Sequence, residues 1–280
     1  MRVLITGQDG QLGRSMQEIL TQHGITILSA PFPEYEITDH KIVQQISSQS
    51  PDVVIHCAAM THVDGCAEDP DLAFRVNAFG AQNVAHGCMR CNADLVYISS
   101  NEVFDGQADT PYTEQSATNP INPYGSSKRS GEKMAERYQP KMYVVRTAWL
   151  YGPGGNNFPT KIMAAADKHG KLRVVADEIG NPTFTLDLAE AIVTLIKTRE
   201  YGTYHFINEG YCSRYDFAAE ILRLTGREHI PLEPITLADY PRASTVPPFC
   251  PLENTQGATL GIKLRPWQDA LAEYLQNITH

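Results

Sequence analysis

Short, nearly continuous apolar runs recur along most of the chain. Strands that are buried on both faces of a parallel sheet show this pattern, because both alternating sets of their side chains contact helices. The predicted strands cover residues 2–6, 25–29, 52–57, 95–100, 143–147 and 204–208.

The stretches between these runs carry apolar side chains every three or four residues, which is the period of a helix with one buried face. Leu12, Met16, Ile19 and Leu20 form one such face. Strands that alternate with helices favour an α/β fold with a Rossmann-type, doubly wound parallel sheet, whose site lies at the carboxyl ends of the strands. Further helices are predicted at 72–88, around Tyr124, and at 162–169, 186–197 and 271–278. Two more are predicted from their N-terminal caps, one after Thr38 or Asp39 and one at 215–225 after Ser213.

The regular alternation loosens after residues 149–155, where glycine and proline become frequent. We therefore expect a Rossmann domain over residues 1–152, to which 183–198 returns, and a smaller C-terminal domain over 153–280 that mainly binds substrate. The proline-rich stretch 231–251 is predicted to be extended and to form a wall of the substrate pocket.

Composition and charge narrow the class of protein. A hydrophobic content of 42% with 20% charged residues is that of an ordinary soluble globular chain. The net charge of -9, without a run of lysine or arginine, argues against nucleic acid or an anionic membrane as the main partner. The first apolar run is too short for a signal or membrane-spanning segment, so a cytoplasmic location is expected. Cys88 and Cys91 form a pair without a second pair, which favours buried thiols and predicts no metal site.

A glycine-rich turn follows the first predicted strand. Gly7, Gly10 and Gly13 form a G-x-x-G-x-x-G pattern that leads directly into a helix. Glycines let a backbone approach a pyrophosphate, and a helix N-terminus offers free N–H groups, so this turn predicts a dinucleotide site. A tight turn without a ligand is the alternative. The second strand ends in Ser29 and Ala30 instead of the acid that binds an NAD ribose, which permits NADP without excluding NAD.

A Y-x-x-x-K pattern carries the candidate chemistry. Tyr124 and Lys128 lie four residues apart, so on a helix they share one face. A neighbouring ammonium is expected to lower the pKa of the phenol and so to prepare it for proton exchange with a carbonyl or alcohol. Ser99 and Ser100 end a predicted strand at the same edge of the sheet. A solvated helix face is the alternative interpretation of the pair.

Together these motifs resemble those of the extended short-chain dehydrogenase/reductase superfamily. Within it, the chain is most similar to the dTDP-4-dehydrorhamnose reductase family, nearly from end to end. The similarity is carried by residues 7–13, 56–64, 67–68, 76–78, 103–106, 122–125 with Lys128, 149–152, 156–158, 182–183, 260–262 and 265–267.

The resemblance implies a Rossmann domain that binds NADPH or NADH, a nucleotide-sugar substrate, and a monomer or homodimer. It implies that Ser100 binds the sugar carbonyl, that Tyr124 gives the proton, and that Lys128 holds the nicotinamide ribose and lowers the tyrosine pKa. Implied cofactor contacts are Gly7, Gly10, Gln11, Leu12, Gly13, Glu36, Ile37, Cys57, Ala58, Ala59, Thr61, Asn77, Ser99, Tyr124 and Lys128. Implied substrate contacts are Val63, Asn101, Glu102, Phe104, Trp149, Asn157 and Phe249.

The chain also departs from the family pattern. Asn101 and Glu102 stand where the family commonly has an acid followed by an aromatic residue, and residues 246–251 lack the arginine of a substrate-binding R-P-x-N-S stretch. We therefore expect a reductase of a 4-keto group on a nucleotide-activated deoxysugar, dTDP-4-dehydro-L-rhamnose or a close analogue. The alternatives are a nucleotide-sugar epimerase or dehydratase that uses Glu102, and a non-catalytic NAD(P)-binding regulatory protein.

Overall fold

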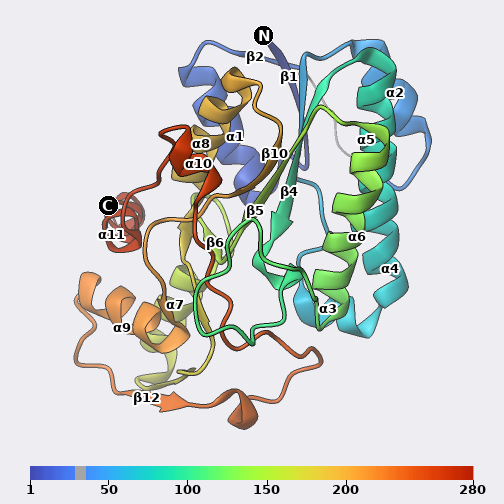
Figure 1. The fold of residues 1–280 in the computed structure, drawn as a ribbon. Helices are drawn as coiled ribbons and strands as arrows, with labels where there is room; N and C mark the ends of the chain where they lie inside the picture. Colours follow the sequence, from blue (N-terminus) through green and yellow to red (C-terminus); the bar gives the residue numbers. More distant parts are fainter. Residues whose placement is uncertain (29–35, 280) are drawn as a thin grey trace.

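The structure is a computed structural model that describes residues 1–28 and 36–279. A parallel sheet forms its centre (Figure 1). Every neighbouring pair of its strands is parallel, which confirms the predicted sheet type. The chain places β2 on one side of β1 and β3 on the other, so the order reverses between β1 and β3. In spatial order, the strands within the described residues are β2 (Thr26–Leu28), β1 (Arg2–Thr6), β3 (Val53–His56), β4 (Asp94–Ser100), β5 (Met142–Thr147) and β10 (Gly202–His205).

Helices cover both faces of this sheet, which explains why its strands are almost wholly apolar. Val3 and Ile5 of β1 pack into one core with α1 and α8, whereas Leu4 between them packs into the opposite core. Figure 1 shows the two helix layers on either side of the strands. One layer contains α1 (Gln11–Gln22) and α8 (Thr185–Thr198), and the other contains α2 (Lys41–Gln49), α5 (Ala81–Cys91) and α6 (Pro123–Tyr138).

The prediction of one continuous helix over 72–88 is wrong in one respect, because the structure has three consecutive helical segments there. These segments are α4 (Pro70–Phe74), a π-helix (Arg75–Gly80) and the start of α5. The wider π turn carries Asn77, whose side chain binds the main chain of Met60 in the loop after β3. Such turns are frequent at functional sites, and a hydrophobic period of 3.6 residues does not reveal them.

The C-terminal part builds a second apolar core, which includes Tyr151, Phe184, Phe217 and Trp267. The chain nevertheless returns to the first part, because α8 packs on α1 and β10 joins the central sheet next to β5. The strand predicted at 204–208 therefore begins earlier and ends at His205. The C-terminal elements include β6 (Leu150–Tyr151), α7 (Phe158–His169), β7 (Leu172–Val175), β8 (Ile179–Gly180), β9 (Thr183–Phe184), β11 (Cys212–Ser213), α9 (Arg214–Leu224), β12 (Leu232–Ile235), α10 (Gln256–Thr259) and α11 (Trp267–Thr279).

Helix α9 shows how local sequence sets an element boundary. The Ser213 hydroxyl accepts a hydrogen bond from the Asp216 N–H, and the Asp216 carboxylate accepts one from the Ser213 N–H. This reciprocal capping satisfies backbone donors that a helix start leaves free, and it confirms the predicted Ser213 cap. No helix in the described ranges combines the length and apolarity that a membrane span needs.

Candidate active site

A cavity of about 610 Å³ opens above the carboxyl ends of β1, β3, β4 and β5. It is therefore at the edge of the sheet where ligands of doubly wound folds bind. Most of the residues predicted from the sequence meet here although they are far apart in the chain. The lining includes Gly7, Gly10, Gln11, Leu12, Gly13, Cys57, Ala58, Ala59, Thr61, Val63, Ser99, Ser100, Asn101, Glu102, Tyr124, Lys128, Trp149 and Asn157.

The glycine turn forms one end of this cavity and leaves no room for side chains. Gly7 has a φ of +69°, and a Cβ on it would lie 2.7 Å from the Ala58 nitrogen. A Cβ on Gly13 would lie 2.2 Å from the Gly7 carbonyl oxygen. The first N–H groups of α1 face this end without partners from a preceding turn. A bare backbone and a helix N-terminus fit the pyrophosphate of a dinucleotide.

The hydroxyls of Ser100 and Tyr124 meet on the opposite side of the same cavity. Ser100 ends β4, and its side chain accepts a hydrogen bond from the Glu102 N–H at 3.2 Å. A hydrogen bond with Ser100 favours the ionised form of the Tyr124 phenol. Tyr124 lies in the first turn of α6. Two adjacent hydroxyl donors can bind and polarise one carbonyl oxygen.

The expectation that Lys128 lowers the pKa of Tyr124 does not agree with the structure. Burial raises that pKa above its ordinary value, and the charge of Glu102 raises it further, whereas Ser100 lowers it. Lys128 is not among the groups that shift it. The phenol is therefore protonated at neutral pH, which is the form needed to donate a proton to a reduced carbonyl.

Lys128 is nevertheless held at the cavity. Its side chain is buried, and its Nζ lies 4.4 Å from the centre of the Tyr97 ring. Burial lowers its pKa to about 8, although the charge of Glu132 acts in the other direction. No hydrogen bond to this Nζ is found among the described residues, so its donors can bind the hydroxyls of a ligand.

A buried ion-pair network lies beneath the two catalytic candidates on α6. Glu132, one turn after Lys128, accepts two hydrogen bonds from Arg146 of β5, each at 2.9 Å. It also accepts one from the Ser99 hydroxyl at 2.5 Å and one from Arg129 at 2.6 Å. These bonds join α6 to β4 and β5, and they hold the Glu132 pKa below its ordinary value despite burial. Ser99 thus has a structural partner in addition to its place on the cavity wall.

The whole chain, residues 1–280, matches the family model described as "RmlD substrate binding domain". A dTDP-4-dehydrorhamnose reductase from Aggregatibacter actinomycetemcomitans is 37% identical over 96% of this chain and 97% of its own. The chain belongs to the dTDP-4-dehydrorhamnose reductase family.

Solved structures of this family agree with the fold. A dTDP-4-dehydrorhamnose reductase from Clostridium acetobutylicum has a TM-score of 0.96 at 39% identity, with 100% of both chains covered. One from Bacillus anthracis, solved in complex with NADP, has a TM-score of 0.95 at 36% identity, with 99% of both chains covered. The resemblance inferred from the motifs is therefore confirmed.

Five residues implied by the family resemblance do not line the cavity. Asn77 is buried and binds Met60 and Ser127, so it positions the loop after β3 instead of facing the cavity. Phe104 is fully buried and stacks on Tyr112, which contradicts the expected substrate contact. Phe249 packs edge-on against Tyr211. The Glu36 carboxylate accepts hydrogen bonds from Thr38. Ile37 is buried in the core between the sheet and helices α2 and α5. Residues 29 and 30, at the end of β2, lie outside the described residues.

Glu102, like Asn101, is a departure from the family pattern that the structure places in the cavity. Its Oε2 accepts a hydrogen bond from Asn122 Nδ2 at 2.6 Å. Asn122 caps α6 through the Gly125 N–H and also binds the Thr245 carbonyl, so it joins three segments around the carboxyl group. Burial raises the pKa of Glu102 to about 7. At this position the chain therefore has a carboxyl group that can gain or lose a proton at neutral pH.

Raising the pH from about 5 to about 8 is expected to destabilise the wild-type protein relative to Glu102→Gln. The folded pKa of about 7 lies above the ordinary value of 4.5, so in this window the folded state keeps a proton that the unfolded state has lost. The stability this supplies is complete below pH 4.5 and is lost as the pH rises through 7. Urea unfolding of both proteins across the range measures the difference, and a difference that does not change with pH contradicts the prediction.

Arg214 lines the cavity but was missed in the sequence. It lies at the start of α9, far along the chain from the glycine turn and from Tyr124, and a lone arginine in a capping sequence carries no motif. In the folded chain its guanidinium stacks on the Trp149 ring, with 3.5 Å between Cζ and the ring centre. This contact joins residues far apart in the sequence, so no local pattern predicts it.

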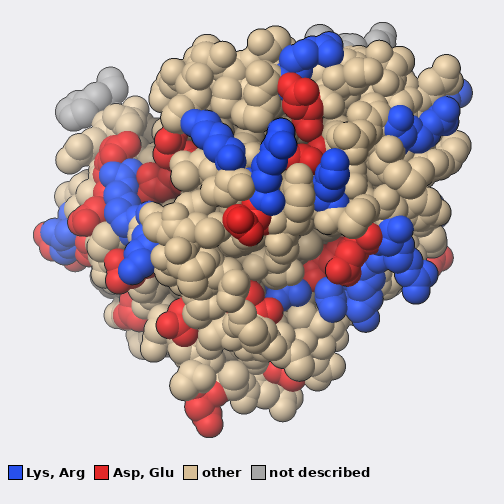
Figure 2. Space-filling model, turned by 45° about the horizontal axis from the view of Figure 1, so that its top comes forward, with Lys and Arg blue, Asp and Glu red and all other residues tan. Residues whose placement is uncertain are grey.

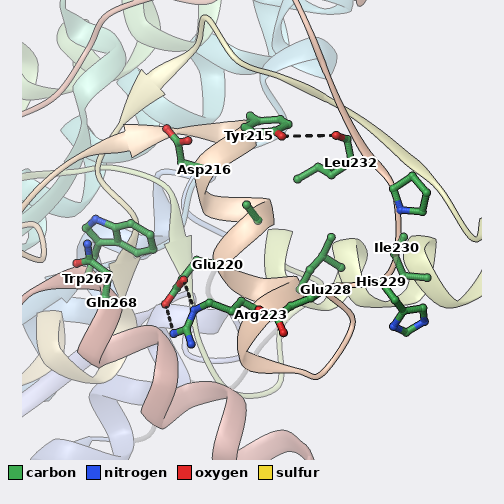
Figure 3. Close-up of a pocket in the computed structure, with 13 residues that line it drawn as sticks. Tyr215, Asp216, Glu220, Arg223, Glu228, His229, Ile230, Leu232, Trp267 and Gln268 are labelled. Carbon is green, nitrogen blue, oxygen red and sulfur yellow. Dashed lines mark hydrogen bonds and ion pairs between the residues drawn. The ribbon is translucent and has the colours of Figure 1, made fainter.

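A second groove, of about 670 Å³, lies between α9, the segment that follows it and the start of α11 (Figure 3). It contains none of the predicted site residues. Arg223 and Glu220, both on α9, point toward each other at its wall and form an ion pair at 2.7 Å. Over the face shown in Figure 2, basic and acidic side chains are interspersed. In the described ranges, no group of three or more histidine, cysteine, aspartate or glutamate side chains is arranged to hold a metal ion.

Proposed function

We propose that this protein reduces the 4-keto group of a nucleotide-activated deoxysugar, dTDP-4-dehydro-L-rhamnose or a close analogue. The observation that carries the proposal is the meeting of Ser100, Tyr124 and Lys128 in one cavity whose other end is a bare glycine turn. Family membership and the NADP complex of the Bacillus anthracis relative support NADPH as the cofactor, with NADH as the alternative.

The dinucleotide would lie along Gly7, Gly10 and Gly13, and its nicotinamide supplies the hydride when bound. Tyr124 donates its phenolic proton to the oxygen of the 4-keto group as that group is reduced, so that a hydroxyl is formed. Ser100 binds the same oxygen and stabilises the negative charge that develops on it. Lys128 provides an ammonium group for the hydroxyls of the cofactor ribose.

The test is to mix the protein with NADPH or NADH and enzymatically prepared dTDP-4-keto sugars, and to follow the absorbance of the reduced nicotinamide. Oxidation that requires both the sugar and the protein supports the proposal. Failure to oxidise either cofactor with any 4-keto sugar contradicts it.

Glu102 favours one second candidate, an epimerase or dehydratase that does not consume cofactor. A carboxyl group with a pKa of about 7 in the cavity could remove a proton next to the keto group. Asn101 argues against dehydration, because its amide cannot supply the second acidic proton. Such an enzyme would exchange solvent deuterium into the keto sugar without net oxidation of NADPH, which mass spectrometry would detect.

A further inference from the structure

Arg214 is held in a fixed position on the wall of the cavity formed by the C-terminal part. Its Nε donates to Glu178 Oε1 at 3.0 Å, and its Nη2 lies 2.9 Å from the same oxygen. Its backbone N–H donates to the Glu178 carbonyl at 3.1 Å. The guanidinium therefore loses little freedom when it binds a further group.

The surface on which Arg214 rests is also rigid. Trp149 has a φ of +44°, a conformation that costs energy for a residue with a side chain and that the surrounding contacts must maintain. Gly180 lies against the same ring, because a Cβ there would be only 2.7 Å from an indole carbon. The Gly180 backbone and the Arg214 guanidinium thus both contact the Trp149 ring and restrict its position.

Part of the hydrogen-bonding capacity of Arg214 is unused. A guanidinium has five N–H donors, and Glu178 engages only Nε and one side of Nη2. Among the described residues, Nη1 has no hydrogen-bond partner, and the side chain keeps 22% of its exposure. Within residues 1–28 and 36–279, the charged side chains that line the cavity are Lys128, Arg214 and Glu102. Lys128 lies beside Tyr124, where the keto group and the nicotinamide ribose would bind. Arg214 is therefore the cation of the cavity wall that can bind a different part of the substrate.

We propose that Arg214 binds the diphosphate of the nucleotide-sugar substrate through Nη1 and the free side of Nη2, a role that rests on the proposed function. A planar guanidinium with two parallel donors matches the oxygens of a phosphate group. Glu178 orients the guanidinium from one side and partly neutralises it, and the diphosphate approaches from the other side. Arg214 thereby supplies the positive charge that residues 246–251 lack.

The binding of dTDP in the presence of saturating NADP⁺, measured by calorimetry, tests this role without turnover. Arg214→Met keeps an apolar chain against Trp149 but removes the charge, and we expect it to weaken dTDP binding roughly tenfold or more. Arg214→Lys should lie between this variant and wild type. Arg223→Met is the matched control, because Arg223 lies on the same helix in an exposed ion pair outside the cavity. The dissociation constant of NADPH should stay the same in all of these variants.

Glu178→Gln separates phosphate binding from simple support of Trp149. If Arg214 binds the diphosphate, Glu178→Gln should strengthen dTDP binding, because the amide oxygen still accepts a hydrogen bond from Arg214 Nε and orients the guanidinium while the neutralising charge is gone. If Arg214 only supports the Trp149 ring, weakening its contact with residue 178 should weaken dTDP binding, and that result overturns the inference. Equal dTDP affinity of wild type and Arg214→Met also overturns it. A wild-type protein that reduces no keto sugar but binds dTDP through Arg214 would refute the proposed reduction and leave this inference standing.

Discussion

Replacement of Tyr124 by phenylalanine is expected to lower kcat for keto-sugar reduction by roughly a hundredfold to ten-thousandfold, the usual contribution of a positioned acid. The phenol forms a hydrogen bond with Ser100 in the cavity, and its raised pKa keeps it protonated at neutral pH. Phenylalanine preserves the packing of the ring and removes only the hydroxyl group. Steady-state oxidation of NADPH with a dTDP-4-keto sugar measures the effect.

Two further measurements show whether the loss is chemical. The dissociation constant of NADPH should change far less than kcat in Tyr124→Phe, because the glycine turn still binds the pyrophosphate without the phenol. Tyr211→Phe is the control, since Tyr211 is exposed and lies outside the cavity. Undiminished reduction by Tyr124→Phe would contradict the assigned role. A regulatory protein would keep its biological activity in that variant.

Replacement of Arg146 by methionine is expected to lower the free energy of unfolding by about 3–5 kcal/mol, the usual cost of breaking a buried ion pair. Arg146 and Glu132 are exposed by only 5% and 2% of their side chains. Without Arg146, the Glu132 carboxylate stays buried with Ser99 and the partly exposed Arg129 as its remaining partners. Urea unfolding at neutral pH measures the change.

The double variant Arg146→Met with Glu132→Leu identifies the cause of this loss. If the uncompensated carboxylate causes it, removing both charges should restore much of the stability. If the double variant is as unstable as the single one, lost packing is the cause. Arg173→Met is the control, because its pair with Glu233 is exposed and 3.6 Å long, and such pairs contribute about 1 kcal/mol or less.

The catalytic candidates were predictable because their signals are local. Gly7, Gly10 and Gly13 follow a strand and precede a helix, and Tyr124 and Lys128 lie one turn apart, so short stretches of sequence contain the whole pattern. The sheet was predictable for a related reason. Strands buried on both faces must be apolar at every position, whatever the details of the helices that cover them.

Electrostatics and substrate contacts were less accessible, because they depend on which side chains meet across the fold. Spacing alone suggested that Lys128 lowers the pKa of Tyr124, but the balance of burial and the Glu102 charge raises it. Phe104 belongs to a motif near the site, yet its ring points into a core with Tyr112. Glu102 acquires a pKa of about 7 only where the fold buries it beside Asn122.

The sequence by itself determined the order of strands and helices, the glycine turn and the tyrosine–lysine pair, because hydrophobic period and residue spacing act over a few residues. Only the tertiary structure decided that Arg214 stacks on Trp149 beside the cavity, that a π turn presents Asn77 to Met60, and that Glu132 joins α6 to the sheet. These arrangements bring together residues that lie far apart in the chain. Their geometry follows from the packing of whole elements, which local patterns do not specify.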